Sequence, residues 1–132
     1  MSRIKRKTYL LLAAMVATVA LLGGSLGMAF AGTANLNSGF NLVGGPIGGD
    51  VAPDQWVACI TPATAWNAVY IWDAPNQRWL HFFNVGNGTP AYVNSSANGG
   101  ITNIPRFAGV ALIMNQAVSN AKLKDSNSTP CS

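Results

Sequence analysis

The chain has 132 residues, with eight Lys and Arg, four Asp, no Glu, a single His and a formal net charge of +4. Half of the cationic side chains lie within the first seven residues, so residues 32–132 hold four Lys or Arg against four Asp and are neutral. This neutrality excludes an interpretation of the positive balance as a nucleic-acid or anionic-membrane surface. Polarity in this part comes instead from Asn, which occurs 13 times, each time after residue 31.

The first 31 residues have the pattern of a secretory signal peptide. A cationic start at residues 3–7 is followed by an apolar run over residues 9–22, and Ala29-Phe30-Ala31 supplies the small-x-small pattern of a cleavage site. We predict cleavage after Ala31, a secreted or cell-surface location on a bacterial cell, and one β-rich extracellular domain over residues 32–132, with no membrane contact after cleavage. A retained anchor is the alternative, because residues 9–31 are just long enough to span a bilayer.

Short elements are expected in the first part of the domain. Gly32–Ser38 reads as a polar lead-in, and Phe40–Val43 reads as a short strand that ends at a run of Gly and Pro. Asp50–Ile60 is consistent with a short helix, with Asp50 as its cap and Pro53 at an early helical position.

The clearest local structure is a β-hairpin over Ala68–Phe83. Two apolar and aromatic runs flank Asp73-Ala74-Pro75-Asn76-Gln77-Arg78, which is rich in turn-forming residues. Pairing of Trp72 with Trp79 predicts a four-residue loop and a register that places Ile71 opposite Leu80, Val69 opposite Phe82, Tyr70 opposite His81 and Asp73 opposite Arg78. One side of this hairpin is then aliphatic plus Phe, and the other holds Tyr, two Trp and His, so a slip of one residue would mix the sides.

The remaining segments complete an all-β prediction. Ala91–Val93 is expected to be a short strand, Ile101–Phe107 to pair in part, and Val110–Met114 to be a buried central strand. The polar residues 119–132 would fray unless Cys131 is tethered. Five or six short, mainly antiparallel strands with frequent turns predict a compact β-sandwich or barrel-like sheet, with one short helix near residues 51–60.

Two cysteines, Cys59 and Cys131, both lie after the leader. An even number of cysteines in an exported chain favours a disulfide, which would close a loop of about 70 residues and stabilise the fold by roughly 4 kcal/mol. Two buried free thiols are the alternative. A metal site is not expected, because two distant Cys and one His supply too few ligands.

Three short motifs of Gly, aromatic and aliphatic residues recur along residues 39–80. They are GFNLVG at residues 39–44, VYIWD at 69–73 and QRWL at 77–80. Together they resemble the Trp-rich "GWNLVGW" type of β module found in exported bacterial proteins, over roughly residues 39–114. This chain has Phe40 in place of the first Trp and Gly45 in place of the second. The resemblance implies an extracellular β module, and no activity is established for that family.

Residues suited to catalysis are scarce. Asp50 and Asp54 flank Pro53 in a turn-like stretch and are expected to cap or to be solvated, and no Gly-x-Ser-x-Gly elbow presents a nucleophile. His81 shares a hairpin side with Tyr70, where packing or hydrogen bonding is its expected role. We therefore predict no enzyme activity, no catalytic residue, no metal and no cofactor. A small extracellular hydrolase, which needs Asp or His side chains in one cleft, is the weaker alternative.

The aromatic residues are the stronger functional signal. In the predicted register Tyr70, Trp72, Trp79 and His81 share one side of the hairpin. In a two-layer domain a second sheet would cover this side and make it core, which is the arrangement we favour. If the side is exposed instead, it forms a candidate ligand platform, because sugar rings stack on aromatic surfaces. The sequence thus predicts a non-catalytic binding or structural module, or alternatively a carbohydrate-binding domain, with a polysaccharide or another surface protein as partner.

Overall fold

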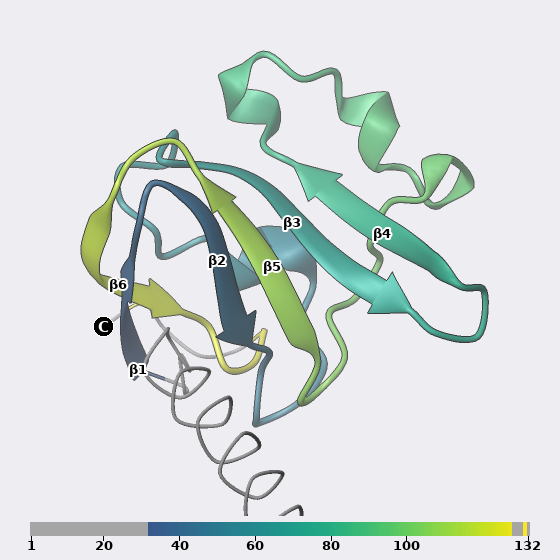
Figure 1. The fold of residues 1–132 in the computed structure, drawn as a ribbon, viewed down its shortest axis with the longest axis horizontal. Helices are drawn as coiled ribbons and strands as arrows, with labels where there is room; N and C mark the ends of the chain where they lie inside the picture. Colours follow the sequence, from purple (N-terminus) through teal and green to yellow (C-terminus); the bar gives the residue numbers. More distant parts are fainter. Residues whose placement is uncertain (1–31, 128–130, 132) are drawn as a thin grey trace, which may run out of the picture.

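Two antiparallel sheets form the fold of residues 32–127 and 131, which are the residues that the computed structural model describes (Figure 1). β1 (Gly32–Leu36) and β6 (Val118–Leu123) make a two-stranded sheet. A four-stranded sheet has the order β2 (Gly39–Gly44), β5 (Gly109–Met114), β3 (Trp66–Asp73), β4 (Arg78–Phe83). The predicted all-β class and compact, sandwich-like arrangement are confirmed, and the sheets do not close into a barrel.

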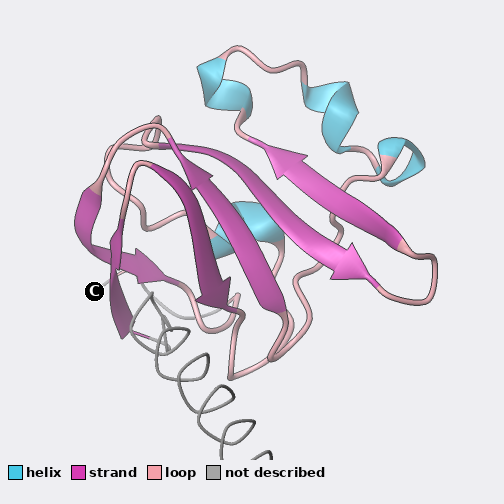
Figure 2. Cartoon of the chain, viewed as in Figure 1, coloured by secondary structure: helices cyan, strands magenta, loops and turns pink. Residues whose placement is uncertain are grey.

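Short helices complete the architecture. α2 (Pro53–Trp56) lies behind the four-stranded sheet, while η1 (Val85–Asn87), η2 (Ala91–Asn94) and η3 (Ser96–Asn98) lie beyond β4 (Figure 2). Among the described residues, no helix has the length and apolarity that crossing a bilayer requires. The predicted leader and its cleavage site lie outside the described residues.

The β3–β4 hairpin has the predicted register at every pair, including Trp72 opposite Trp79 and Tyr70 opposite His81. The Arg78 Nε lies 3.4 Å from an Asp73 carboxylate oxygen across the loop. The same oxygen accepts a 2.8 Å hydrogen bond from the Asn76 side-chain amide. These contacts close the loop at the position where the strands end.

β5 is the centre of the large sheet, as its unbroken apolar sequence predicts, and it pairs with β2 on one side and with β3 on the other. Val110 and Leu112 face inward and are fully buried. An irregularity in pairing between Trp66 and Ala68 inserts Asn67, which shifts the alternation by one residue. Trp66 therefore turns to the inner face, where its ring stacks on Phe82 at a centroid distance of 6.1 Å.

The hydrophobic core lies between the inner face of the four-stranded sheet, the α2 segment and the small sheet. Trp56, which is 1% exposed, contributes the largest fully buried side chain. The cover over the sheet comes mostly from residues outside strands: Val51, Trp56, Val57, Ile60, Ile101 and Ile104. Leu36, Ala121 and Leu123 add the contribution of β1 and β6.

Three local predictions are wrong. The expected lead-in at residues 32–38 is strand β1, which pairs with β6. The expected strand at residues 91–93 belongs to helix η2, because the Asn94 side chain bonds both the N–H and the carbonyl of Phe83 and occupies the edge of β4. Asp50 does not cap α2, whose N-cap is Ala52; its carboxylate accepts the Arg106 backbone N–H at 2.8 Å. The early helical position expected for Pro53 is confirmed.

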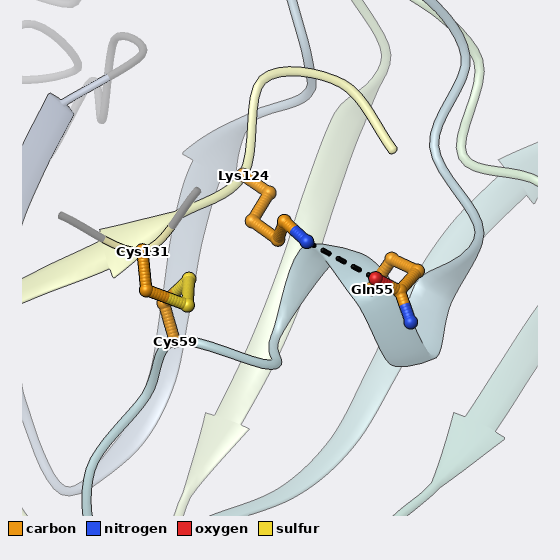
Figure 3. Close-up of a disulfide and its surroundings, with 4 residues drawn as sticks. All are labelled: Gln55, Cys59, Lys124 and Cys131. Atoms are coloured by element: carbon orange, nitrogen blue, oxygen red, sulfur yellow. Dashed lines mark hydrogen bonds between the residues drawn. A yellow bond between two sulfur atoms is a disulfide. The ribbon is translucent and has the colours of Figure 1, made fainter. Parts of the chain in front are cut away.

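A disulfide joins Cys59, just after α2, to Cys131, as predicted (Figure 3). Hydrogen bonds hold the segment after β6 against the same region. The Lys124 ammonium donates to the Gln55 side chain at 3.1 Å, and the Lys124 backbone N–H donates to the Trp56 carbonyl at 3.2 Å. The end of the chain is thus tied to the cover of the core.

Candidate functional site

The side of the four-stranded sheet that faces away from α2 carries a set of large apolar side chains, and Figure 1 looks onto this side. Strand alternation explains its composition, because residues two apart share a face. We call it the outer face and define it by Phe40 and Leu42 of β2, Ala111 and Ile113 of β5, Tyr70 and Trp72 of β3, and Trp79 and His81 of β4.

Exposure of the tryptophans decides between the two roles left open by the sequence. Trp72 is 46% exposed and Trp79 is 58% exposed, so the preferred expectation that these rings form core is wrong. The aliphatic side of the hairpin, with Val69 and Ile71, is the buried one. The two indole rings contact each other with centroids 5.3 Å apart and planes inclined by 63°. They form an angled pair rather than one flat plane.

A shallow groove runs along β5 on this face. Its volume is about 350 Å3, and its lining consists of Phe40, Tyr70, Trp79, Ala111 and Ile113. The floor of the groove lies below its walls, because Gly109 has no side chain, Ala111 has only a methyl group, and the space above Gly109 is open. Larger side chains on β2 form one wall, and the aromatic side chains of β3 and β4 form the other.

The structure brings three of the four predicted platform residues together at the surface and gives the fourth another role. Tyr70 is half-buried between Ala111 and His81 in the sheet. The His81 Nε2 donates to the Val93 carbonyl at 2.8 Å, and its ring lies 4.8 Å from that of Phe83. His81 therefore holds the η2 segment against β4, which agrees with the packing role that the sequence suggested for it.

Three hydrogen-bond donors of the outer face have no partner among the described residues. The Tyr70 hydroxyl and the indole N–H groups of Trp72 and Trp79 make no hydrogen bond to any other described residue. Asp73 alternates with Trp72 along β3, so its side chain lies on the other side of the sheet, where one carboxylate oxygen contacts both Asn76 and Arg78. The hydrogen bond from Asn76, with a smaller effect of Arg78, holds the pKa of Asp73 below its ordinary value of 3.8.

Phe40 and Leu42, which the sequence analysis did not assign to the site, are 67% and 60% exposed. The period-two alternation of Phe40 and Leu42 with Asn41 and Val43 was the available signal for a strand with two faces. It did not show which face is exposed, because the polar Asn41 points inward while the apolar Phe40 and Leu42 point outward. The buried Asn41 amide is satisfied there: it donates to the Asn37 carbonyl at 2.8 Å and accepts the Asn37 N–H at 2.8 Å. Without that local bonding pattern, an Asn is expected to face water.

A second depression of about 230 Å3 lies between the α2 segment and β4, with Trp66 and Phe82 in its wall. Asp54 is the charged residue of its lining, which includes no His. Asn84, the other polar side chain of the lining besides Asp54, donates to the carbonyls of Ala63 and Trp66 at 2.8 Å each. Asp54 is the single carboxylate in this lining, so the lining holds no acid–base pair.

Within the described ranges 32–127 and 131, no three His, Cys, Asp or Glu side chains gather as metal ligands would. No family model, curated protein or solved structure matches the chain. The resemblance to Trp-rich modules of exported proteins thus stays a prediction, and a function has to be inferred from the outer face itself.

Proposed function

We propose that the protein is an exported, non-catalytic binding module that contacts its partner through the outer face. The observation that carries this proposal is the exposure of Phe40, Leu42, Trp72 and Trp79 on one side of one sheet, each between 46% and 67%. The largest apolar patch on a soluble protein is often a contact site. Tyr70 is the one ionisable residue in the lining of the groove, which favours binding over acid–base chemistry.

Export is supported by two independent features. The first 31 residues have the pattern of a signal peptide, and Cys59 and Cys131 form a disulfide. Structural disulfides persist in oxidising compartments and are rare in the cytosol. We therefore place the module outside the cell or at its surface.

A polysaccharide is one candidate partner, and another surface protein is the other. The Trp72–Trp79 pair lies at the hairpin end beside Asp73, Asn76 and Arg78, so that aromatic surface and polar side chains occur together. Sugars use both, stacking their C–H faces on rings and bonding their hydroxyls to polar groups at the rim. The groove over β5 fits a sugar less well, since Phe40, Ala111 and Ile113 offer no hydrogen-bond partner in their side chains.

Co-sedimentation with insoluble envelope material tests the proposed function. Purified peptidoglycan, bacterial envelope fragments, cellulose and chitin are incubated with the protein and with the Trp72→Ala/Trp79→Ala double variant. We expect one envelope material to retain the protein and to retain the double variant at least ten-fold less. Tyr92→Ala is the matched control, because Tyr92 is 71% exposed but lies in η2, outside the outer face.

Equal retention of the double variant and the protein would contradict the proposal, and so would retention by none of the materials. Melting temperatures accompany the assay. Both variants should remain folded, because the substituted side chains are exposed and contribute little to the core.

A further inference from the structure

We propose that the groove over β5 binds a proline-rich polypeptide segment in the polyproline II conformation. This inference rests on the proposed function, because it assigns a class of partner to the same outer face. Proline-rich segments bind to aromatic-lined grooves in several unrelated domains, where the extended helix loses little conformational entropy on binding.

Hydrogen-bonding chemistry is the first reason. The outer face presents three donors that bond no other residue within 32–127 and 131, the Tyr70 hydroxyl and the indole N–H groups of Trp72 and Trp79. The Asp73 carboxylate is not an acceptor on this face, because Asp73 alternates with Trp72 along β3 and its side chain lies on the other side of the sheet. The two indole groups only donate, and the Tyr70 hydroxyl can also accept, so a complementary ligand supplies mainly acceptors. A run of prolines does so, because each residue has a carbonyl and none has an N–H.

The same reasoning ranks other ligands lower. Sugar hydroxyls are donors as well as acceptors, and those above Phe40, Ala111 and Ile113 would lose water without gaining a partner. An ordinary extended peptide carries an N–H at each residue, and these too would lie unpaired over the centre of the sheet. The backbone groups of β5 are engaged on both sides by β2 and β3, so they offer such a peptide no hydrogen bonds.

Groove dimensions are the second reason. The floor runs from Gly109 to Ile113 along β5, and at about 3.3 Å per residue it is roughly 13 Å long. Its walls stand on β2 and β3, which are two inter-strand spacings of about 4.8 Å apart, close to 10 Å. A polyproline II helix rises about 3.1 Å per residue, so four or five residues fill this length.

Patch size favours a segment over a globular partner. Large aromatic side chains present about 150–250 Å2 each, and the four most exposed side chains of the outer face are about half accessible, so they offer on the order of 400 Å2. A stable protein–protein interface, including one with a second copy of this chain, buries about 800 Å2 on each side. A short segment matches the smaller area.

Strand addition at β4 is blocked. The His81 N–H donates to the Gly99 carbonyl at 3.0 Å, and the Ile101 N–H donates to the His81 carbonyl at 2.8 Å. The Asn94 side chain pairs with both backbone groups of Phe83. A partner that approaches from this side therefore meets the ring faces of the hairpin rather than a free strand edge.

Titration with an acetylated, amidated decaproline peptide tests the inference, with the four indole N–H resonances of the protein followed by NMR. We expect the resonances of Trp72 and Trp79 to shift and those of Trp56 and Trp66, which are 1% and 7% exposed, to stay in place. Trp79→Ala should weaken binding at least ten-fold, and Trp79→Phe, which keeps a ring but removes the donor, should weaken it several-fold. Tyr92→Ala should bind as the unmodified protein does.

Each other outcome overturns the inference in an identifiable way. No shift with decaproline up to millimolar concentration refutes it, and shifts with cellohexaose or a chitin hexamer instead would assign the face to a sugar and leave the proposed function intact. Stronger binding of a Thr- and Val-rich decapeptide would indicate strand addition at β2. Shifts that change on dilution of the protein alone would indicate a second copy as the occupant. Absence of a shift with every probe, together with unchanged envelope binding by the double Trp variant, would refute both proposals.

Discussion

Reduction of the Cys59–Cys131 disulfide should destabilise the protein strongly, because the bond closes a long loop. The two cysteines are 72 residues apart in the sequence. For a loop of this length the chain-entropy model gives a loss of about 4 kcal/mol when the constraint on the unfolded chain is removed. The hydrogen bonds of Lys124 with Gln55 and Trp56 belong to the folded state and place no constraint on the unfolded chain, so they do not offset that loss.

Thermal unfolding with and without a phosphine reductant measures the effect. For a domain of about 100 residues each kcal/mol corresponds to a shift of about 4–8 °C, so we expect the melting temperature to fall by roughly 15–30 °C. The Cys59→Ser/Cys131→Ser variant should melt with the reduced protein and should not respond to the reductant. A fall of less than about 3 °C, with reduction verified by thiol titration, would refute the entropic reasoning.

Three further predictions concern the core, a buried amide and a carboxylate. Trp56→Ala should lower the free energy of unfolding by about 3–5 kcal/mol in urea titrations, whereas Trp79→Ala should cost about 1 kcal/mol since its ring is 58% exposed; similar costs would contradict the assignment of faces. Asn84→Ala should cost about 1–3 kcal/mol in the same assay, because it leaves the Ala63 carbonyl without its donor and the Gly86 N–H without its acceptor, while the Trp66 carbonyl keeps the Asn87 amide. The pKa of Asp73 should lie below 3.8 in a carboxyl NMR titration, since the Asn76 hydrogen bond stabilises the charged carboxylate. The contribution of this carboxylate to folding stability is therefore present above its pKa in the unfolded chain and is lost as the pH falls through its pKa in the folded protein. A midpoint at or above 3.8 would show that this hydrogen bond is absent.

Local patterns in the sequence were sufficient for the hairpin. Alternation with a period of two, a loop of turn-forming residues and the Asp73–Arg78 pair act within 16 residues, and the observed register agrees at each position. The central position of β5 was predictable for a similar reason, because an unbroken apolar run is buried on both faces of a sheet or at its centre.

Which side of the hairpin is covered was not predictable from these patterns. Both sides are apolar, and the choice depends on which segments fold over them. The cover consists of the α2 region with Ile101 and Ile104, residues that lie in loops and follow no strand period. Their position depends on contacts far apart in the sequence, such as the paired backbone groups of Val51 and Ile104.

The small sheet was missed because its signal is weak. β1 contributes Ala34 and Leu36 to the core and β6 contributes Val118, Ala121 and Leu123, a few apolar positions among polar neighbours. Such a pattern is close to that of a loop. These two strands form because they pair with each other, although they lie near opposite ends of the domain in the sequence. The local sequence of either segment does not reveal that pairing.

The exposed Trp72–Trp79 pair can serve the stability of the hairpin as well as the binding of a partner. Cross-strand aromatic pairs stabilise a hairpin by about 0.2–1 kcal/mol, so Trp72 and Trp79 would be useful to the fold without any ligand. This explanation does not extend to Phe40 and Leu42, whose direct cross-strand neighbours are Ile113 and Ala111 of the groove floor, neither of them aromatic. On a neutral domain, such exposed side chains lower solubility and add little to the core. Exposed apolar side chains thus stand on both walls of the groove, on β2 and on the hairpin. Hairpin stability explains only the Trp pair, whereas a partner that occupies the groove after folding explains both walls.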